Sequence, residues 1–179
     1  MLIRLESLVI AVVAVVGLAG GLPALANDLQ NHTIPASMCE PDGSSADKLL
    51  LSYGSYVFSG SNTGWATLQC PLPLGPWAGT PGAASDMPGF RVYYRDSDGT
   101  TYASRVFVRL SARRDDGSSY WGPWWDSNDH PETGYNIEYK ATGTNLAFQN
   151  LYYFYVYLYR ADTAQNTAFS GIDFVTPIL

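Results

Sequence analysis

The chain has 179 residues, a formal net charge of −6 and no clustered basic stretch beyond Arg113-Arg114, which Asp115-Asp116 follows directly. Nucleic acid and anionic membrane surfaces are bound through groups of Lys and Arg, so this composition argues against both as partners. Hydrophobic residues make up 46% of the chain, which is too many for a disordered protein. We therefore predict a folded protein that binds no nucleic acid.

The first 26 residues have the pattern of a secretory signal peptide. Arg4 supplies a positive charge, residues 8–18 form an apolar run, and Ala24-Leu25-Ala26 matches the small-x-small site of a signal peptidase. The run is shorter than the ~20 residues of a membrane-spanning helix, although a retained N-terminal anchor is the alternative. We predict a signal peptide over 1–26 and one domain over 27–179, which is secreted, periplasmic or at the cell surface and is not an integral membrane protein.

Cys39 and Cys70 are the two cysteines of the chain. Two cysteines in an exported protein form a disulfide by default, and no C-x-x-C spacing indicates the alternative, a metal or redox pair. We predict a Cys39–Cys70 bond. It closes a loop of about 30 residues, for which the loop-entropy model gives roughly 3–4 kcal/mol of stabilisation.

Beyond the leader, apolar and polar residues alternate with period 2 rather than with the period of a helix. Residues 48–53 and 55–58 predict a strand pair or one bent strand with a glycine at the bend. Residues 65–70 predict the next strand, which Pro71 ends because it cannot donate to a ladder. The five prolines and four glycines of residues 71–89 exclude a regular element and predict a surface crossover within one domain.

The middle of the chain predicts two hairpins. Residues 90–95 alternate between two faces, and the turn at 96–99 contains a glycine that can adopt positive φ before a return strand over 101–112. In that return strand the inward residues are Val106, Val108 and Leu110, and the outward residues are Arg105, Phe107 and Arg109. A second turn at 115–118 leads to Tyr120-Trp121, and residues 135–140 alternate again.

Residues 151–160, LYYFYVYLYR, form the most strongly β-forming segment of the chain. Both faces of this segment are apolar or amphipathic, so we predict a central strand with both sides covered. Residues 169–175 give a closing strand. Eight or nine short strands without a repeat predict an all-β fold, an antiparallel β-sandwich of jelly-roll or immunoglobulin-like type with one disulfide.

Two short motifs resemble those of a known group of proteins. Residues 34–41 (IPASMCEP) and 68–73 (LQCPLP) are similar to the "PASxCxP … CPLP" frame of a loose group of exported bacterial β proteins, in which a strand like residues 92–96 (VYYRD) follows. The resemblance covers about residues 33–110 and rests on turn and disulfide chemistry. It implies a paired, sandwich-like fold and transfers no active-site residue.

The most suggestive ligand site is YWGPWW, residues 120–125, because three Trp in five residues do not easily enter one core. The apolar face of a sugar ring stacks on exposed aromatic rings, and nearby polar side chains then add directional hydrogen bonds. A structural alternative is that Trp121 and Trp125 cap the open end of the sandwich. The predicted ligand-binding residues are Tyr120, Trp121, Trp124, Trp125, Asp126 and Asn128.

We predict no catalytic residue, no metal and no cofactor. No G-x-S-x-G motif is present, and His32 and His130 are the only imidazoles of the chain. Calcium loops at 96–99 or 126–132 are alternatives that the spacing supports only in part. A hydrolase is a further alternative, since a glycosidase needs only two carboxylates; the candidates are Asp126, Asp129, Glu132 and Glu138.

These observations predict an exported, non-catalytic protein whose partner is a glycan. The alternative is a structural subunit that associates with copies of itself. That alternative rests on the Tyr-rich strand at 151–160 beside the apolar residues 175–179, because an unpaired strand edge of this composition would favour strand addition.

Overall fold

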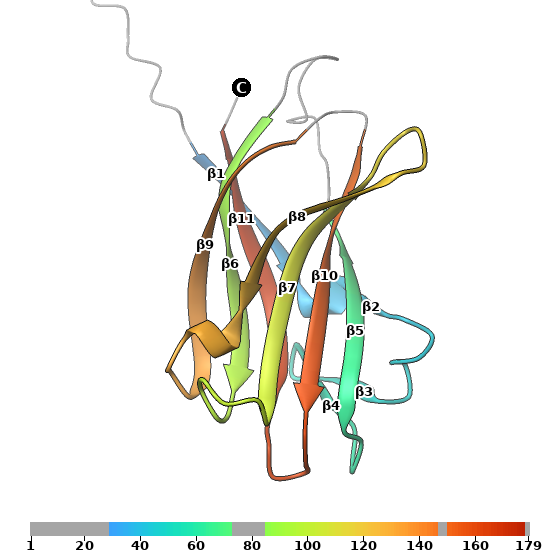
Figure 1. Ribbon diagram of the computed structural model, residues 1–179, viewed down its shortest axis with the longest axis vertical. Coiled ribbons are helices and arrows are strands. Elements are labelled where there is room, and N and C mark those ends of the chain that lie inside the picture. The colour runs from blue at the N-terminus through green and yellow to red at the C-terminus, as the bar shows by residue number, and fades with distance from the viewer. Residues whose placement is uncertain (1–28, 73–84, 147–149, 178–179) are drawn as a thin grey trace, which may run out of the picture.

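The computed structural model describes residues 29–72, 85–146 and 150–177, so the predicted signal peptide lies outside the described residues. The described residues form eleven strands and two short 3-10 turns, and the strands build two antiparallel sheets packed face to face (Figure 1). The predicted all-β antiparallel sandwich is confirmed. No helix among the described residues is long and apolar enough to cross a membrane.

One sheet has six strands in the order β3-β4-β11-β6-β9, with β1 also paired to β11. Its strands are β1 (Leu29–Pro35), β3 (Leu49–Ser52), β4 (Ser55–Phe58), β6 (Ser85–Asp96), β9 (Gly134–Leu146) and β11 (Ala168–Pro177). The strand pair predicted over residues 48–58 is confirmed as a hairpin. Tyr53 and Gly54 both have positive φ at its two-residue turn, as the right-handed twist of paired strands favours.

The other sheet has five strands in the order β2-β5-β10-β7-β8. Its strands are β2 (Glu40–Pro41), β5 (Gly64–Pro71), β7 (Ser104–Arg113), β8 (Ser119–Asp126) and β10 (Leu151–Arg160). The prediction that residues 151–160 are a central strand is confirmed, because β10 pairs with β5 and β7. The prediction that both faces of this strand are covered is wrong, because the outward tyrosines of β10 are only half-buried and Leu151 is exposed.

The core fills the space between the two sheets. Successive side chains of a strand point to opposite faces, so each strand contributes every second residue to it. The largest fully buried side chains include Phe90, Val92 and Tyr94 of β6, Leu110 of β7, Phe154 and Leu158 of β10, and Phe169, Ile172 and Phe174 of β11.

The predicted disulfide between Cys39 and Cys70 is confirmed. Both cysteines are buried, and the bond joins the segment that follows the 3-10 turn η1 (Ala36–Met38) to β5. The hydroxyl of Tyr56, on β4, donates to the carbonyl oxygen of Cys39 at 3.0 Å. The disulfide-bonded segment is therefore tied to both sheets.

The predicted hairpin of residues 90–112 is wrong, because β6 and β7 belong to different sheets. The loop between them crosses the sandwich and is held by side chains instead of a strand ladder. Asp98 Oδ2 accepts hydrogen bonds from the backbone N–H groups of Ala103 at 2.7 Å and Ser104 at 2.9 Å, and Asp96 Oδ2 accepts from Ser127 Oγ at 2.5 Å. Alternation determines which side chains of a strand point into the core. The arch leaves that assignment unchanged for β6 and β7, but it places the two strands in different sheets instead of pairing them.

The crossover predicted over residues 71–89 is wrong at its end, because β6 already begins at Ser85. Pro88 and Gly89 lie inside this strand at a register shift against β9. A Cβ atom at Gly89 would lie 2.5 Å from the carbonyl oxygen of Lys140, so the close approach of the two strands requires glycine. Residues 73–84 of the predicted crossover lie outside the described residues.

Candidate functional site

Strand β8 divides the three tryptophans of the predicted site between its two faces. Trp121 and Trp124 are 46% and 45% exposed, whereas Trp125 is 2% exposed and packs edge-on against Tyr94 in the core. A register shift places Trp124 opposite Arg109 and Trp121 opposite Ser111, so the two β8 residues between them lie opposite one residue of β7. This bulge puts both exposed tryptophans on the outer face of the five-stranded sheet.

Asp126 and Asn128 serve the fold in this structure. Asp126 is buried and accepts two hydrogen bonds from Arg105, with Nε donating to Oδ1 at 2.9 Å and Nη2 donating to Oδ2. Asp126 also caps the 3-10 turn η2 (Ser127–Asp129) by accepting from the backbone N–H of Asn128 at 3.1 Å. Asn128 Nδ2 donates to the carbonyl oxygen of Thr101 in the arch. Both predicted hydrogen-bonding side chains, Asp126 and Asn128, are therefore engaged within the chain.

The exposed tryptophans continue into a layer of stacked rings that crosses four strands. Trp121 stacks on Tyr155 with 5.6 Å between ring centroids and an interplanar angle of 27°, and Trp124 stacks on Phe107 at 5.6 Å and 22°. We use the name aromatic face for the outward residues Trp65, Phe107, Trp121, Trp124, Tyr155 and Tyr157. The neighbouring strands β5, β10, β7 and β8 supply them, as the order of the sheet in Figure 1 shows.

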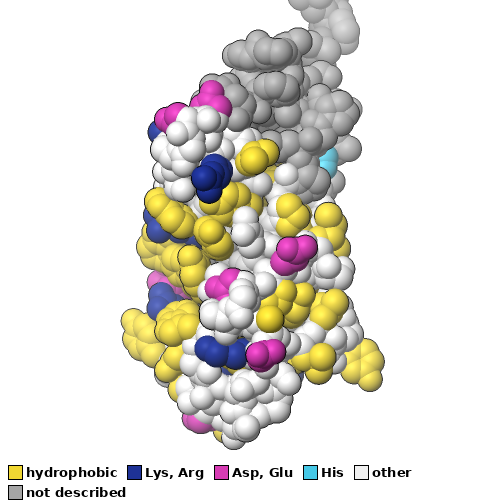
Figure 2. Space-filling view, turned by 90° about the vertical axis from the view of Figure 1, so that its right-hand side faces the viewer, with side chains coloured by type: hydrophobic (Ala, Val, Ile, Leu, Met, Phe, Trp, Pro, Cys, Tyr) yellow, Lys and Arg dark blue, Asp and Glu magenta, His cyan; other side chains and the backbone are white. Residues whose placement is uncertain are grey.

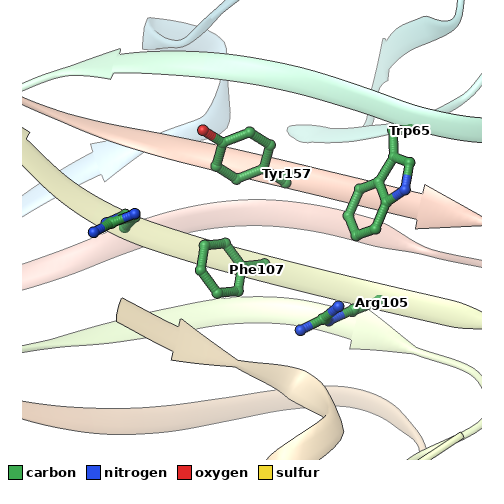
Figure 3. Close-up of a pocket in the computed structure, with 5 residues that line it drawn as sticks. Trp65, Arg105, Phe107 and Tyr157 are labelled. Carbon is green, nitrogen blue, oxygen red and sulfur yellow. The ribbon is translucent and has the colours of Figure 1, made fainter. Parts of the chain in front are cut away.

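A shallow hollow of about 360 Å³ lies within the aromatic face. Its lining residues are Trp65, Arg105, Phe107, Arg109 and Tyr157. Figure 3 shows Tyr157 and Phe107 side by side on adjacent strands, with Trp65 and Arg105 toward the other end of the hollow. The ring centroids of Phe107 and Tyr157 are 5.6 Å apart. An apolar, ring-lined hollow with a few fixed polar groups is the usual form of a small-molecule site.

Three cations lie against the rings of this face. The Arg109 guanidinium carbon is 4.9 Å from the centre of the Trp121 ring, that of Arg105 is 5.6 Å from the Phe107 ring, and Lys140 Nζ is 5.6 Å from the Trp124 ring. Cations at such distances are attracted to the ring faces. In the side view of Figure 2, hydrophobic and basic side chains adjoin one another along the left margin. The hydrogen bond to Asp126 raises the pKa of Arg105 further, so this guanidinium stays charged.

The sequence interpretation missed Trp65, Phe107, Tyr155 and Tyr157 as members of the site. Alternation placed Phe107 on the outward face of its strand. It also put Tyr155 and Tyr157 on one face of theirs, but both faces of that strand were predicted to be covered. What the sequence does not contain is the order of strands in the sheet, which brings residues from positions 65, 107, 121 and 155 together. The ligand-binding role of the six residues predicted from the sequence stays a prediction.

One group of described residues has the spacing of a metal site, namely His130, Glu132 and Glu138, whose ligand atoms lie within 4.8 Å of one another. His130 Nδ1 is 3.7 Å from Glu138 Oε2, and its ring stacks on Trp125. His32, the other imidazole, lies on β1 and stacks on Phe174. The contact with Glu138 and the stacking on Trp125 account for the position of His130.

The calcium loop considered at residues 96–99 uses its carboxylates within the chain. Burial raises the pKa of Asp96 to about 6, and its two oxygens accept hydrogen bonds from the backbone N–H of Asp98 and from Ser127 Oγ. Burial also acts on Asp98, but hydrogen bonds from Asp96, Thr101 and the backbone outweigh it and lower the pKa of this group. Both side chains hold the arch between β6 and β7 together.

No protein-family model and no curated protein matches this chain. Among solved structures, the chain is similar to a family two carbohydrate esterase from Cellvibrio japonicus, with 12% identity and a TM-score of 0.46 over 84% of this chain; it spans 34% of the esterase. It is similar to the CBM36-1 domain of a multidomain xylanase from the hindgut metagenome of Trinervitermes trinervoides, with 9% identity and a TM-score of 0.45 over 81% of this chain and 96% of that one.

A third similar structure is CBM86, a low affinity xylan binding module from Roseburia intestinalis, with 9% identity and a TM-score of 0.43 over 82% of this chain and 96% of that one. At these identities the likeness concerns the fold alone. The class of protein defined so far is a disulfide-bonded antiparallel β-sandwich with an exposed layer of stacked rings on one sheet.

Proposed function

We propose that this protein is an exported, non-catalytic carbohydrate-binding protein that holds a glycan across the aromatic face. The observation that carries the proposal is the exposure of Trp121 and Trp124 on one face, each held nearly parallel to a second ring. An exposed apolar surface of this kind is typical of an interaction site. Flat rings fixed by stacking offer a sugar a rigid surface, so little conformational freedom is lost on binding.

The shape of the aromatic face favours an extended ligand over a compact one. Its rings come from four neighbouring strands, which are spaced by about 4.8 Å in a sheet, so several sugar units find a ring beneath them. The hollow between Trp65 and Arg109 is shallow, and it would hold one unit of such a chain. We infer that the ligand is an oligosaccharide or polysaccharide lying across the strands.

The state of the carboxylate beside the aromatic face supports binding over hydrolysis. Asp126 is buried and bidentately bound by Arg105, so it offers no free acid or base to a glycosidic bond. Glu138 of the other predicted candidates is paired with His130.

The test is binding of the purified protein to a glycan array, followed by calorimetry with the best ligand. The variant Trp121→Ala, Trp124→Ala removes two rings and leaves Trp125 in the core. We expect it to lose at least about 30-fold in affinity, the effect of one central aromatic residue in an interface. The matched control is Tyr135→Ala, Tyr139→Ala, which removes two exposed rings from the other sheet and should bind normally.

Absence of binding to every glycan, or unchanged affinity of a folded double variant, would contradict the proposal. Circular dichroism and thermal unfolding of both variants show whether the fold is intact. Each variant removes two exposed aromatic rings, from opposite sheets, so a selective loss in Trp121→Ala, Trp124→Ala places the ligand on the aromatic face.

Self-association stays a prediction, but its expected edge is not free. β10 is hydrogen-bonded to β5 on one side and to β7 on the other over most of its length, so it cannot accept a further strand. Of the apolar residues 175–179, the last two lie outside the described residues. Sedimentation velocity at increasing concentration tests self-association through any other surface.

A further inference from the structure

Arg109 occupies the middle of the aromatic face and has an unmet hydrogen-bonding group. Its guanidinium lies 4.9 Å from the Trp121 ring and lines the hollow with Phe107 and Tyr157. Its Nε atom is buried and has no hydrogen-bond partner. Buried donors in folded proteins are nearly always paired, so the unpaired Nε distinguishes Arg109 from Arg105, whose Nε donates to Asp126.

Arg105 and Arg109 lie in the same surroundings but differ in their partners. Both arginines lie on the outward side of β7, four residues apart, and both line the same hollow. Asp126 neutralises Arg105 through two hydrogen bonds. Within the described ranges, Arg109 forms no ion pair. The same side-chain type is thus used once to hold the fold and once with its charge uncompensated.

Lys140 adds a second cation to this part of the face. Its Nζ atom lies 5.6 Å from the centre of the Trp124 ring, and it too forms no ion pair with any described residue. The whole chain carries a net charge of −6, yet each of the two exposed tryptophans of β8 has a cation without an ion pair against it. Two cations therefore adjoin the exposed rings of β8.

We propose that the aromatic face recognises an acidic oligosaccharide, in which the carboxylate of a hexuronate unit pairs with Arg109 while the sugar rings stack on Trp121 and its neighbours. This inference rests on the proposed glycan-binding function. A guanidinium presents a planar fork of N–H donors that matches a carboxylate, and stacking on Trp121 holds that fork in one plane before the ligand arrives. Lys140 contributes a further attraction for the anionic chain without fixing its geometry.

Calorimetry with defined ligands tests the inference. The acidic probes are hexagalacturonate, hexamannuronate and glucuronoxylan, and the neutral probes are xylohexaose and cellohexaose. We expect an acidic probe to bind at least about tenfold more tightly than either neutral one at low ionic strength, with the difference shrinking as salt rises.

Three variants identify the group responsible. Arg109→Met keeps the apolar stem over Trp121 and removes the charge, so it should abolish the preference and leave the weaker neutral-type binding. Arg109→Lys keeps the charge without the fork and should retain only part of the preference. The matched control Arg91→Met removes an exposed arginine from β6, in the other sheet, and should leave the preference intact.

The outcomes separate the two proposals. Equal affinity for acidic and neutral probes, or a preference that survives in folded Arg109→Met, overturns the acidic-ligand inference and leaves glycan binding standing. A preference lost equally in Arg91→Met also overturns it, because the effect would then be one of net charge. If no probe and no glycan of the array binds, the proposed function fails and the inference falls with it.

Discussion

The outer faces of the two sheets contain similar side chains in different arrangements. On the five-stranded sheet, Trp121 stacks on Tyr155 and Trp124 on Phe107, so the rings form a continuous layer. On the six-stranded sheet the tyrosines act one at a time. Tyr93 donates its hydroxyl to Asp173, and Tyr139 donates to the carbonyl oxygen of Pro88 at 3.2 Å.

The difference teaches that aromatic content does not by itself define a ligand surface. Tyr135 lies beneath Arg95 at 5.1 Å, much as Trp121 lies beneath Arg109, but no second ring of the described residues stacks on Tyr135. An exposed ring is held flat for a ligand when a second ring lies beside it on the same face, at a nearby position of another strand. Only the order β5-β10-β7-β8 supplies such neighbours repeatedly.

The largest expected contrast between the faces concerns their arginines. Arg105→Met would leave the buried carboxylate of Asp126 without its partner, and we expect the free energy of unfolding to fall by about 3–5 kcal/mol. Arg95→Met removes a cation that only covers Tyr135, so a change below about 1 kcal/mol is expected. Urea unfolding of both variants measures the contrast, and equal losses would show that the Arg105–Asp126 pair is not specially important.

The buried carboxyl group of Asp96, in the arch between the two sheets, should make the free energy of unfolding depend on pH. The pKa of Asp96 is about 6 in the fold against 3.8 in the unfolded chain, because burial favours the protonated carboxyl. The stability gained from this proton is fully present below pH 3.8 and is lost as pH rises through 6. We expect a loss of up to about 3 kcal/mol between pH 4 and pH 7.

Unfolding measured across this range, for the natural protein and for Asp96→Asn, checks the prediction. The asparagine variant should show a smaller fall, since it cannot ionise. The lowered pKa of Asp98 acts in the opposite direction and in a separate window, because its contribution is lost only as pH falls below 3.8. Parallel pH curves for the two proteins would contradict the assignment to Asp96.

The smallest expected effect compares one apolar residue from each outer face. Phe107 contacts the rings of Trp124 and Tyr157, so Phe107→Ala should destabilise the fold by about 1–2 kcal/mol. Ile137 is 57% exposed on β9, and Ile137→Ala should change stability by less than about 0.5 kcal/mol. Thermal unfolding resolves the difference, and a larger loss at Ile137 would reverse the comparison.

The short-range features of the fold follow from the sequence. Alternation identified most of the strands, and it placed Phe107 and Arg109 on an outward face. The exported-type cysteine pair predicted the Cys39–Cys70 bond. A glycine at a bend between two apolar runs is a local signal. It predicted a strand pair or one bent strand, and the first of these alternatives is the hairpin observed after Ser52.

The tertiary structure decided which strands are neighbours, and with them the site. The turn after Asp96 has the composition of a hairpin, yet the chain crosses to the other sheet because Asp96 and Ser127 hold an arch there. The bulge that turns Trp121 and Trp124 to the same side, with Trp125 in the core, depends on the pairing of β8 with β7. Alternation states which face a residue occupies. The partners of that residue on the same face, such as Asp126 beside Arg105, depend on hydrogen-bonded pairing between segments far apart in the sequence.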